Sequence, residues 1–324
     1  MNKQVIALAA LALIGTAASA QSTVTVYGKL DQSVGKPVGS TDKQVMDLAG
    51  SRLGFRGTED LGGGLKAIFG LEHRFNPDNG TSASSSTFWN GYSLVGISSD
   101  FGTVALGRQY VAAYIVQNEI DPFGGDTVAA LRDIGVRPRL SAINASEVRI
   151  GDTRVADVVR YDGKFGPVAV AVSAGEAPAG KPDRPTSFAV TYKDGALFAG
   201  LSYENPASAN DQLITVGGTY ALPMVTLAAA YSSGKTTTDL STKSFLIGGT
   251  VPMGSLDIKF GYAKTTNDQA GSAADQTLGK IGLGLHYKLS KRTKVYADIA
   301  KVNGTLTPST TSKNGYDLGI QHNF

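Results

Sequence analysis

The stretch SRLGFRGTEDLGGGLKAIFGLE, residues 51–72, decides the fold because charged and apolar side chains alternate on both sides of a glycine-rich turn. Successive side chains of a β-strand point to opposite faces of the sheet. Arg52 and Arg56 therefore share one face of a strand, while Leu53 and Phe55 share the other. One face must contact water and the other an apolar medium. A soluble sandwich and a barrel with an apolar outer surface both satisfy that demand.

The N-terminal segment has the layout of a cleavable secretory signal peptide. Lys3 precedes an apolar run over residues 5–14, and a small-residue triplet, ASA, ends the segment. We therefore expect residues 1–20 to be removed and residues 21–324 to form the mature protein. No later stretch of the sequence approaches the roughly 20 consecutive apolar residues that a helical membrane span requires. If the chain crosses a membrane, it crosses with strands.

Composition excludes several classes of protein and of site. Removing 20 residues from 324 leaves 304, without a linker that would divide them, so we expect one large unit. The sequence has no cysteine, which excludes disulfides, thiolate metal sites and a thiol nucleophile. A net charge of +3 is too small to predict a nucleic-acid partner. The glycines at 62–64 lack the lysine and helix of a nucleotide loop, and residues 77–80 lack the remaining ligands of a calcium loop, so we expect no cofactor and no metal.

Short alternating segments recur along the whole chain and predict strands with one apolar face. Short turns and long polar loops alternate strictly between these segments, as in a meander that crosses a membrane and returns. We therefore predict an all-β fold, a 16-stranded antiparallel transmembrane β-barrel over residues 21–324. The predicted strands are the two runs of 51–72 and residues 23–31, 87–98, 103–109, 154–161, 168–175, 187–193, 197–204, 213–222, 225–232, 244–251, 256–265, 277–288, 293–302 and 316–324.

The alternation also assigns side chains to the two faces of the barrel. Lipid offers no hydrogen bonds, so the sheet must close on itself. An arginine that faces lipid at mid-depth costs about 2–4 kcal/mol, so Arg52 must face a water-filled lumen. Arg108 shares the face of Val104 and Leu106 and is therefore predicted to point outward. The other predicted lumen charges are Lys29, Asp31, Arg56, Lys66, Arg74 and Arg160. This interior set is basic and predicts attraction of small anions.

Four motifs resemble the general porins of Gram-negative outer membranes, in particular the β-proteobacterial branch. They are the opening stretch, VTVYGKLDQSV at 24–34, FGTVALGRQ at 101–109 and the ending YDLGIQHNF at 316–324. Their order and positions extend the resemblance over nearly the whole chain. The family implies a passive diffusion channel in the outer membrane, a homotrimer, and lipid and lipopolysaccharide around it.

The resemblance also implies a third external loop, about 110–153, that folds into the lumen and narrows the pore. By the same resemblance, Arg52 matches a family arginine on the second strand and Glu72 matches the acid at the end of FGLE. Asp121 begins a segment that resembles the acidic turn of the constriction, and Arg154 matches an arginine that leads out of the loop. One position departs from the family, because Tyr92, or Gly91 beside it, stands where a wall arginine is expected. We therefore expect only a weak to moderate preference for anions.

Two further assignments rest on the family. Arg108 is a candidate for a contact between subunits of the trimer, the alternative being that it reaches the membrane interface. The last strand ends in an aromatic residue and resembles the signal that the outer-membrane assembly machinery reads. The signal residues share one face: Tyr316, Leu318, Ile320 and Phe324.

Three other functions compete with a general porin. An enzyme is disfavoured because His73, His286 and His322 have no recognisable serine motif beside them, and nucleophilic catalysis needs such a constellation. A substrate-specific channel for organic acids or phosphate remains open, since a basic ladder would serve it. A structural or adhesive barrel that acts through its loops is the third alternative, and single-channel conductance separates it from a porin.

Overall fold

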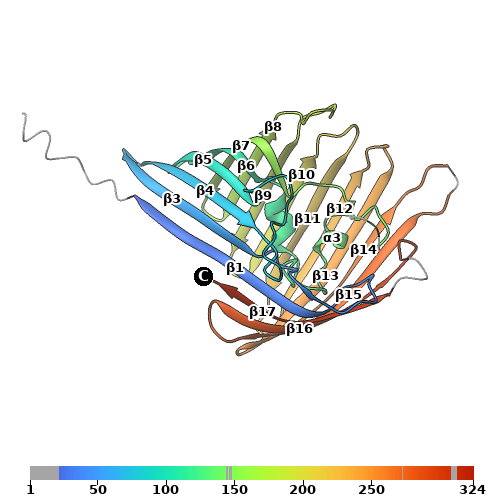
Figure 1. Ribbon diagram of the computed structural model, residues 1–324. Helices are drawn as coiled ribbons and strands as arrows, with labels where there is room; N and C mark the ends of the chain where they lie inside the picture. Colours follow the sequence, from blue (N-terminus) through green and yellow to red (C-terminus); the bar gives the residue numbers. More distant parts are fainter. Residues whose placement is uncertain (1–21, 144, 146–147, 272, 308–311) are drawn as a thin grey trace, which may run out of the picture.

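The computed structural model describes residues 22–143, 145, 148–271, 273–307 and 312–324. The predicted signal peptide lies outside these residues. The described chain forms a sheet of seventeen antiparallel strands, which Figure 1 shows wrapped around a central space. β2 is a three-residue strand beside β1 in the first long connection, and the other sixteen form the wall.

The strands follow one another around the wall in chain order. Their bounds are β1 Thr23–Lys36, β2 Gln44–Met46, β3 Arg52–Gly62, β4 Leu65–Arg74, β5 Tyr92–Ser99, β6 Gly102–Tyr110, β7 Arg154–Phe165, β8 Val168–Gly175, β9 Thr186–Asp194, β10 Leu197–Asn205, β11 Gln212–Ala221, β12 Thr226–Lys235, β13 Ser241–Met253, β14 Leu256–Asn267, β15 Gln276–Lys288, β16 Thr293–Asn303 and β17 Asn314–Asn323.

The barrel closes where the last strand pairs with the first. β17 is antiparallel to β1 from Lys29 opposite Asn323 to Lys36 opposite Tyr316. Beyond the end of β17, the amide of Gly28 donates to the Phe324 carbonyl at 3.0 Å, and the amide of Phe324 donates back at 3.1 Å. This pairing leaves no free edge, as a sheet in lipid requires. The predicted closed 16-stranded barrel is confirmed.

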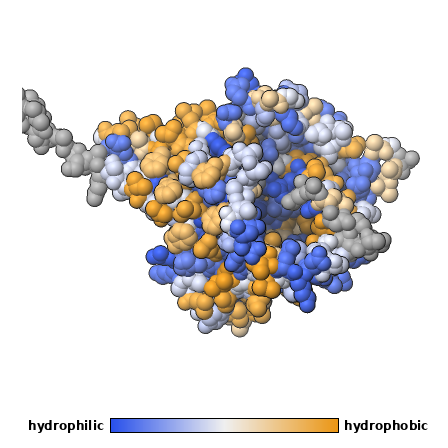
Figure 2. Space-filling model, viewed as in Figure 1, coloured by the Kyte–Doolittle hydropathy of each residue, from blue (hydrophilic) through white to orange (hydrophobic). Residues whose placement is uncertain are grey.

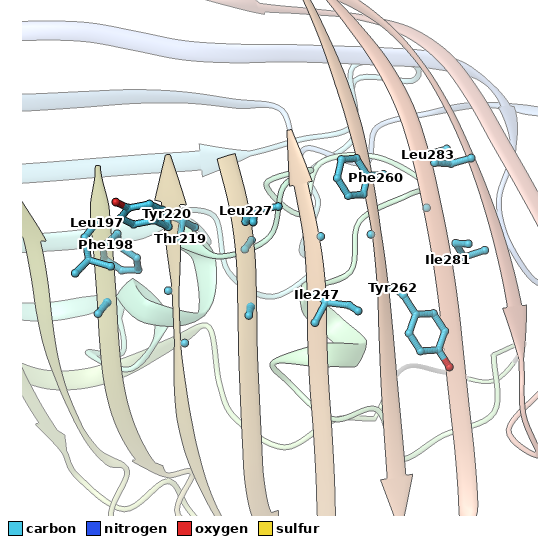
Figure 3. A pocket seen from close by; sticks show the side chains of 18 residues that line it. Leu197, Phe198, Thr219, Tyr220, Leu227, Ile247, Phe260, Tyr262, Ile281 and Leu283 are labelled. Carbon is cyan, nitrogen blue, oxygen red and sulfur yellow. The ribbon is translucent and has the colours of Figure 1, made fainter. Parts of the chain in front are cut away.

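The outer face of the wall carries mainly apolar side chains. Leu53 is 37% exposed and Val26 is 55% exposed, whereas Arg52 points to the other side of β3, toward the centre. Figure 2 shows apolar side chains over the outside of the strands and hydrophilic ones around the hollow. Figure 3 shows part of this outer face, where Tyr220 and Ile247 project from neighbouring parts of the wall. Alternation along the strands thus separates the two media.

Several predicted boundaries differ from the structure; the first strand, for example, ends at Lys36 rather than at residue 31. The predicted strand 87–98 begins only at Tyr92, because residues 87–91 are turns and bends. The glycine-rich turn within residues 51–72 is tight, because β3 continues to Gly62, whose amide donates to the Asp60 carboxylate at 2.8 Å. The turn itself is formed by glycines with positive φ, 80° at Gly62 and 61° at Gly63. Glycine adopts that conformation without steric cost.

The connection between β6 and β7, residues 111–153, packs against the inner wall. It contains the short helices α2 (Tyr114–Glu119) and α3 (Arg132–Gly135), and Figure 1 shows α3 within the ring of strands. Among the described residues, no helix is long and apolar enough to cross a bilayer. Hydroxyl groups of the wall donate to carbonyls of the loop, from Ser232 to Val136 at 2.9 Å and from Thr265 to Ile134 at 2.5 Å.

The loop has an apolar core of its own. The period-2 pattern of the strands does not predict this core. Its side chains Val116 and Leu131 are fully buried. A side-chain carbon added at Gly261 of β14 would lie 2.5 Å from Leu131, and one added at Gly200 of β10 would lie 2.9 Å from Val116. These glycines let the loop approach the sheet closely. The loop, rather than water, therefore covers the inner face of β10–β15 around Gly200 and Gly261.

Candidate pore constriction

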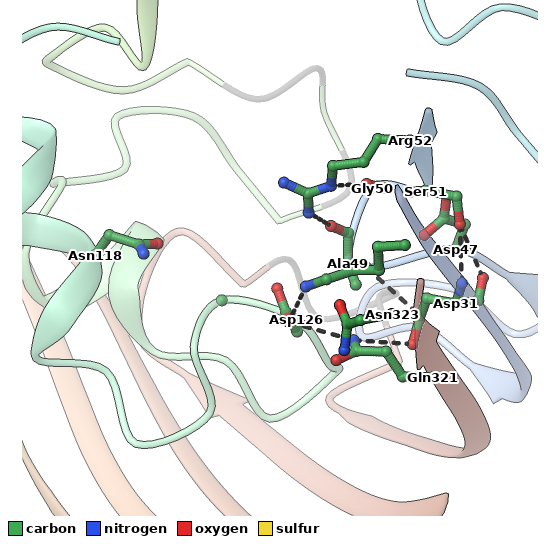
Figure 4. A network of polar contacts seen from close by, with 12 residues as sticks. Asp31, Asp47, Ala49, Gly50, Ser51, Arg52, Asn118, Asp126, Gln321 and Asn323 are labelled. Atoms are coloured by element: carbon green, nitrogen blue, oxygen red, sulfur yellow. Dashed lines mark hydrogen bonds and ion pairs between the residues drawn. The ribbon is translucent and has the colours of Figure 1, made fainter. Parts of the chain in front are cut away.

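A cavity of about 460 Å³ lies between the loop 111–153 and the wall of β1, β3 and β4. Four cationic side chains and two acidic ones line it, so its formal charge is positive. Figure 4 shows Asn118 of α2 on the opposite side of this opening from Arg52. The polar lining residues are Lys29, Asp47, Arg52, Arg74, Tyr114, Asn118, Asp126 and Arg132.

Backbone carbonyls of the first long connection orient Arg52. Its Nε donates to the Gly50 carbonyl at 3.1 Å and its Nη2 donates to the Ala49 carbonyl at 2.9 Å (Figure 4). Arg74 is directly opposite Arg52 on β4. Neither carbonyl carries a formal charge, so the full positive charge of Arg52 is retained at the cavity.

Arg74 is held by an acid and by a tyrosine. Its Nε lies 3.0 Å from the Glu72 carboxylate, which is 3% exposed and also accepts from the Tyr27 hydroxyl at 3.1 Å. The Nη2 of Arg74 donates to the Tyr110 hydroxyl at 2.9 Å. Arg154 donates to that same hydroxyl, and its guanidinium lies 4.1 Å from the centre of the Tyr110 ring. The structure thus brings the predicted residues Glu72, Arg74 and Arg154 together around Tyr110.

Tyr110 and Tyr114 are site residues that the sequence reasoning missed. Strict alternation from Leu106 would turn Tyr110 outward. The pairing of β6 with β7 is irregular here, because Gly107 pairs with Val158 and Gln109 with Val155, which leaves one extra residue on β7. φ is 114° at Gly107 and 55° at Asp157. This irregularity breaks the alternation and allows Tyr110 to face the lumen. The glycine at position 107 is the only sequence signal of that break.

The acidic side of the opening is formed by Asp126 rather than by the predicted Asp121. Lys29 donates to the Asp126 carboxylate at 2.9 Å, and both side chains line the cavity. Asp121 is 5% exposed, and its carboxylate accepts from backbone amides within the loop. The donors are the amides of Phe123, Gly125, Leu131 and Arg132. Asp121 therefore shapes the loop that carries Asp126.

Two of the predicted lumen charges are bound by other side chains within the wall. Asp31 is fully buried and accepts from the Tyr296 hydroxyl at 3.0 Å and from Gln321 at 3.3 Å. Arg160 is 9% exposed and forms an ion pair with Asp162 at 2.5 Å. Both residues belong to the inner face, but neither lines the cavity.

The remaining predicted lumen residues lie near the cavity or away from it. The Arg56 guanidinium lies 5.2 Å from the centre of the Tyr27 ring. The hydroxyl of Tyr92 contacts the hydroxyl of Tyr27, so a tyrosine pair occupies the place where the family arginine was expected. Lys66 is exposed and lies opposite Asp60 in the register of β3 and β4 near their turn, outside the cavity lining.

An ion cluster in the loop supports Arg132, which lines the cavity. Asp133 accepts from Arg132 at 3.1 Å and from Arg137 at 3.4 Å, and Arg149 lies 3.6 Å away. Burial alone would raise the pKa of the Asp133 carboxyl, but the three guanidinium groups hold that pKa well below its usual value. Burial favours the neutral form of Arg132, yet Asp133 and Tyr114 raise its pKa, so it keeps its charge.

Arg108 lies near the end of β6 that leads into the loop 111–153, opposite Ser93 of β5. Its guanidinium donates twice to the Asn90 carbonyl at 3.3 Å, and the residue lines a second cavity with Asp152 and Arg154. The predicted residues of the last strand lie on the outer face. On β17, Tyr316 is 39% exposed and Leu318 is 65% exposed. Phe324 is 42% exposed, and its ring covers Gly28.

The described part of the chain contains no group of three or more His, Cys, Asp or Glu residues that could hold a metal ion. His286 is buried and lies 3.1 Å from the Asp298 carboxylate. His322 stacks on Phe324 at the outer face, and His73 stacks on Phe88. The three histidines are thus engaged at separate places in the wall.

Comparison with known proteins agrees with this geometry. The profile of the Gram-negative porin family matches residues 7–306. Outer membrane porin protein 32 of Delftia acidovorans is 32% identical over 352 residues, covering 99% of this chain and 95% of the relative. An outer membrane porin of Bordetella pertussis is 27% identical, with both chains fully covered. The anion-selective porin from Comamonas acidovorans superimposes with a TM-score of 0.75 and 25% identity, covering 94% of this chain and 100% of that one. The chain belongs to the Gram-negative porin family and is an outer-membrane β-barrel.

Proposed function

We propose that this porin is a passive diffusion channel for ions and small hydrophilic solutes with a weak to moderate preference for anions. The observation that carries the proposal is the unequal charge around the cavity, where Lys29, Arg52, Arg74 and Arg132 face only Asp47 and Asp126. Low-dielectric walls focus such a field and raise the local concentration of ions of opposite sign. An anion therefore enters the narrow region more readily than a cation.

The preference is limited by charge pairing inside the opening. Asp126 binds Lys29, Glu72 binds Arg74 and Asp133 binds Arg132. Three of the four cavity cations therefore have a carboxylate within hydrogen-bond distance, and Arg52 is bound by backbone carbonyls. Salt screens the remaining field beyond about 8–10 Å at physiological ionic strength. A neighbouring structure is described as an anion-selective porin, which supports the same sign of preference.

A substrate-specific channel for organic acids or phosphate is the second candidate. Arg52 and Arg74 lie directly opposite each other on neighbouring strands, which favours a specific channel. Two guanidinium groups can together bind a carboxylate or phosphate. A specific channel saturates as the anion concentration rises, whereas a diffusion pore conducts in proportion to it. Conductance measured over a range of phosphate and malate concentrations separates the two.

The test is the reversal potential across a planar bilayer under a potassium chloride gradient. We expect wild-type channels to favour chloride over potassium and Arg52→Ala to reduce that ratio by about twofold, because one focused charge is lost. Arg184→Ala is the matched control, since Arg184 is 65% exposed in an outer loop and pairs with Glu176. A cation-preferring wild type, or an Arg52→Ala channel with the wild-type ratio, contradicts the proposal.

The proposal extends to a homotrimer embedded in lipid and lipopolysaccharide. Arg108 is the candidate contact, since it is half-buried near the loop end of β6 and binds the Asn90 carbonyl of the preceding outer loop. Arg108→Glu should then shift the oligomer toward monomers in native mass spectrometry. An unchanged trimer would assign Arg108 to the membrane interface instead.

A further inference from the structure

Two stacked tyrosines stand between arginines that come from distant parts of the chain. The rings of Tyr110 and Tyr114 are 4.9 Å apart and inclined by 14°. The Arg154 guanidinium lies over the Tyr110 ring at 4.1 Å, and the Arg132 guanidinium lies over the Tyr114 ring at 5.4 Å. The four side chains form one column, which we call the tyrosine–arginine column.

The hydroxyl groups of the column bind further arginine atoms. Arg74 and Arg154 both donate to the Tyr110 hydroxyl, which therefore joins β4 to β7. The Tyr114 hydroxyl accepts from Arg132 at 3.0 Å, and Arg132 also donates to Asn118 at 2.8 Å. Two phenol groups thus contact three guanidinium groups from β4, β7 and α3.

The tyrosine–arginine column offsets the repulsion between neighbouring guanidinium groups. Guanidinium groups remain charged in proteins and repel one another, so flexible arginines around an opening would spread apart. The negative face of an aromatic ring attracts a cation without cancelling its charge. A phenolic oxygen accepts hydrogen bonds with the same consequence. A carboxylate in that place would hold the arginines but neutralise their field.

Arg154 depends on this support most strongly. Its Nε is buried and has no hydrogen-bond partner in the described part of the chain. The contacts that hold its guanidinium are those to the ring and hydroxyl of Tyr110. Without Tyr110, the group loses its contact with the side of the constriction that carries Arg74.

We propose that Tyr110 and Tyr114 are positioning residues that set the anion selectivity of the channel by holding Arg74 and Arg132 at the constriction and Arg154 beside it. The inference rests on the proposed anion preference and deepens it. It assigns part of the selectivity to uncharged side chains, in a pore where Tyr92 replaces a wall arginine.

Three single variants test the role of Tyr110. Tyr110→Phe keeps the ring and removes the hydroxyl, while Tyr110→Leu removes both. Tyr161→Phe is the matched control, because the Tyr161 hydroxyl donates to the Phe101 carbonyl near a turn at one end of the barrel, away from the cavity. The chloride-to-potassium permeability ratio is measured for each from reversal potentials, together with the melting temperature of the folded protein.

We expect the permeability ratio to fall by about twofold in Tyr110→Phe and further in Tyr110→Leu, since ring contacts add to the hydroxyl contacts. Tyr161→Phe should keep the wild-type ratio. Tyr114→Phe removes only the hydrogen bonds of that hydroxyl to Arg132 and Asn118. The permeability ratio should therefore fall less in Tyr114→Phe than in Tyr110→Leu.

The outcomes separate this inference from the proposed function. A wild type without anion preference overturns the proposed function. A wild type that prefers anions, with Tyr110→Phe and Tyr110→Leu at the wild-type ratio, overturns the positioning role alone. A lower melting temperature with an unchanged ratio also overturns it, because the tyrosines would then serve stability only.

Discussion

Arg52 and Arg74 stand directly opposite each other on β3 and β4, with both side chains on the lumen face. Like charges in opposed positions of neighbouring strands destabilise a sheet. The two guanidinium groups are held by different means, Arg52 by carbonyls of residues 49 and 50 and Arg74 by Glu72 and Tyr110. The pair is retained at a cost in stability, which is expected where a local charge serves function.

Replacing Glu72 with glutamine tests how pairing limits the field. The substitution removes one negative charge beside Arg74 and leaves the shape of the side chain nearly unchanged. We expect the chloride-to-potassium permeability ratio to rise by about twofold, because the charge of Arg74 is no longer offset. The free energy of unfolding should fall by about 1.5–3 kcal/mol, as is typical when a hydrogen bond to a charged group is lost.

Glu176→Gln is the control for this prediction. Glu176 pairs with Arg184 at 3.2 Å in an outer loop, and its side chain is 69% exposed. Exposed pairs contribute little, so both the permeability ratio and stability should stay near wild type. If Glu72→Gln and Glu176→Gln have the same permeability ratio, Glu72 does not offset the field of the constriction.

The wall of the barrel could be predicted from the sequence because period-2 alternation and membrane exposure act on every residue. Leu53 outward and Arg52 inward follow from polarity alone. The alternation failed at Tyr110, where a register shift beside Gly107 reverses the face. Such a shift depends on pairing with β7, which lies beyond the 43-residue loop 111–153. Local sequence carries no direct sign of that pairing.

The side-chain contacts within the loop could not be predicted from the sequence either. Asp121 and Asp126 are acids of the same segment, and resemblance to the family favoured Asp121. Their roles differ because Asp121 accepts from the loop's own amides while Asp126 faces Lys29. Which carboxylate faces the cavity depends on the three-dimensional course of the loop. This course depends on how the loop packs against Gly261 and Gly200.

The seat of the loop can be tested at Gly261. Gly261→Ala adds a carbon 2.5 Å from the Leu131 side chain and 2.9 Å from the Ile247 carbonyl, so Leu131 and the loop that carries it must shift. Overpacking of this kind typically costs about 1–3 kcal/mol of unfolding free energy. We also expect a larger single-channel conductance, because a displaced loop narrows the lumen less.

The double variant Gly261→Ala, Leu131→Ala provides the control for contact. Leu131→Ala alone should cost about 2–5 kcal/mol, since it leaves a cavity at a fully buried position. In the double variant the added methyl group fits into the space that Leu131 leaves. The loss of unfolding free energy should therefore be smaller than the sum of the losses in the two single variants. Strict additivity would mean that Leu131 does not rest on Gly261.

Acid should weaken the loop through Asp133. The arginines around Asp133 hold its pKa below the unfolded value of 3.8, so its charge stabilises the folded state above about pH 4. That contribution is lost as the pH falls through the folded-state pKa. The difference in melting temperature between wild type and Asp133→Asn should therefore be constant from pH 5 to pH 8 and shrink below about pH 4.

A control for acid sensitivity is Asp239→Asn, which breaks an exposed pair with Lys235. Its melting temperature should stay close to wild type at neutral pH, since exposed pairs contribute about 0–1 kcal/mol. A difference between wild type and Asp133→Asn that persists unchanged at pH 2 would show that the ion cluster does not stabilise the loop through charge.

The terminal ring should matter for assembly rather than for conduction. Phe324 closes the sheet by two backbone hydrogen bonds to Gly28, and its ring covers that glycine on the outer face. Phe324→Ala removes the ring and keeps the backbone pair, so we expect severalfold less folded protein in the outer membrane and an unchanged single-channel conductance. Leu318→Ala is the matched control, because Leu318 is on the same face of the last strand and is more exposed, 65% against 42%. If the assembly machinery reads only the apolar face, the two variants lose folded protein equally, and equal loss would refute a special role for the terminal ring.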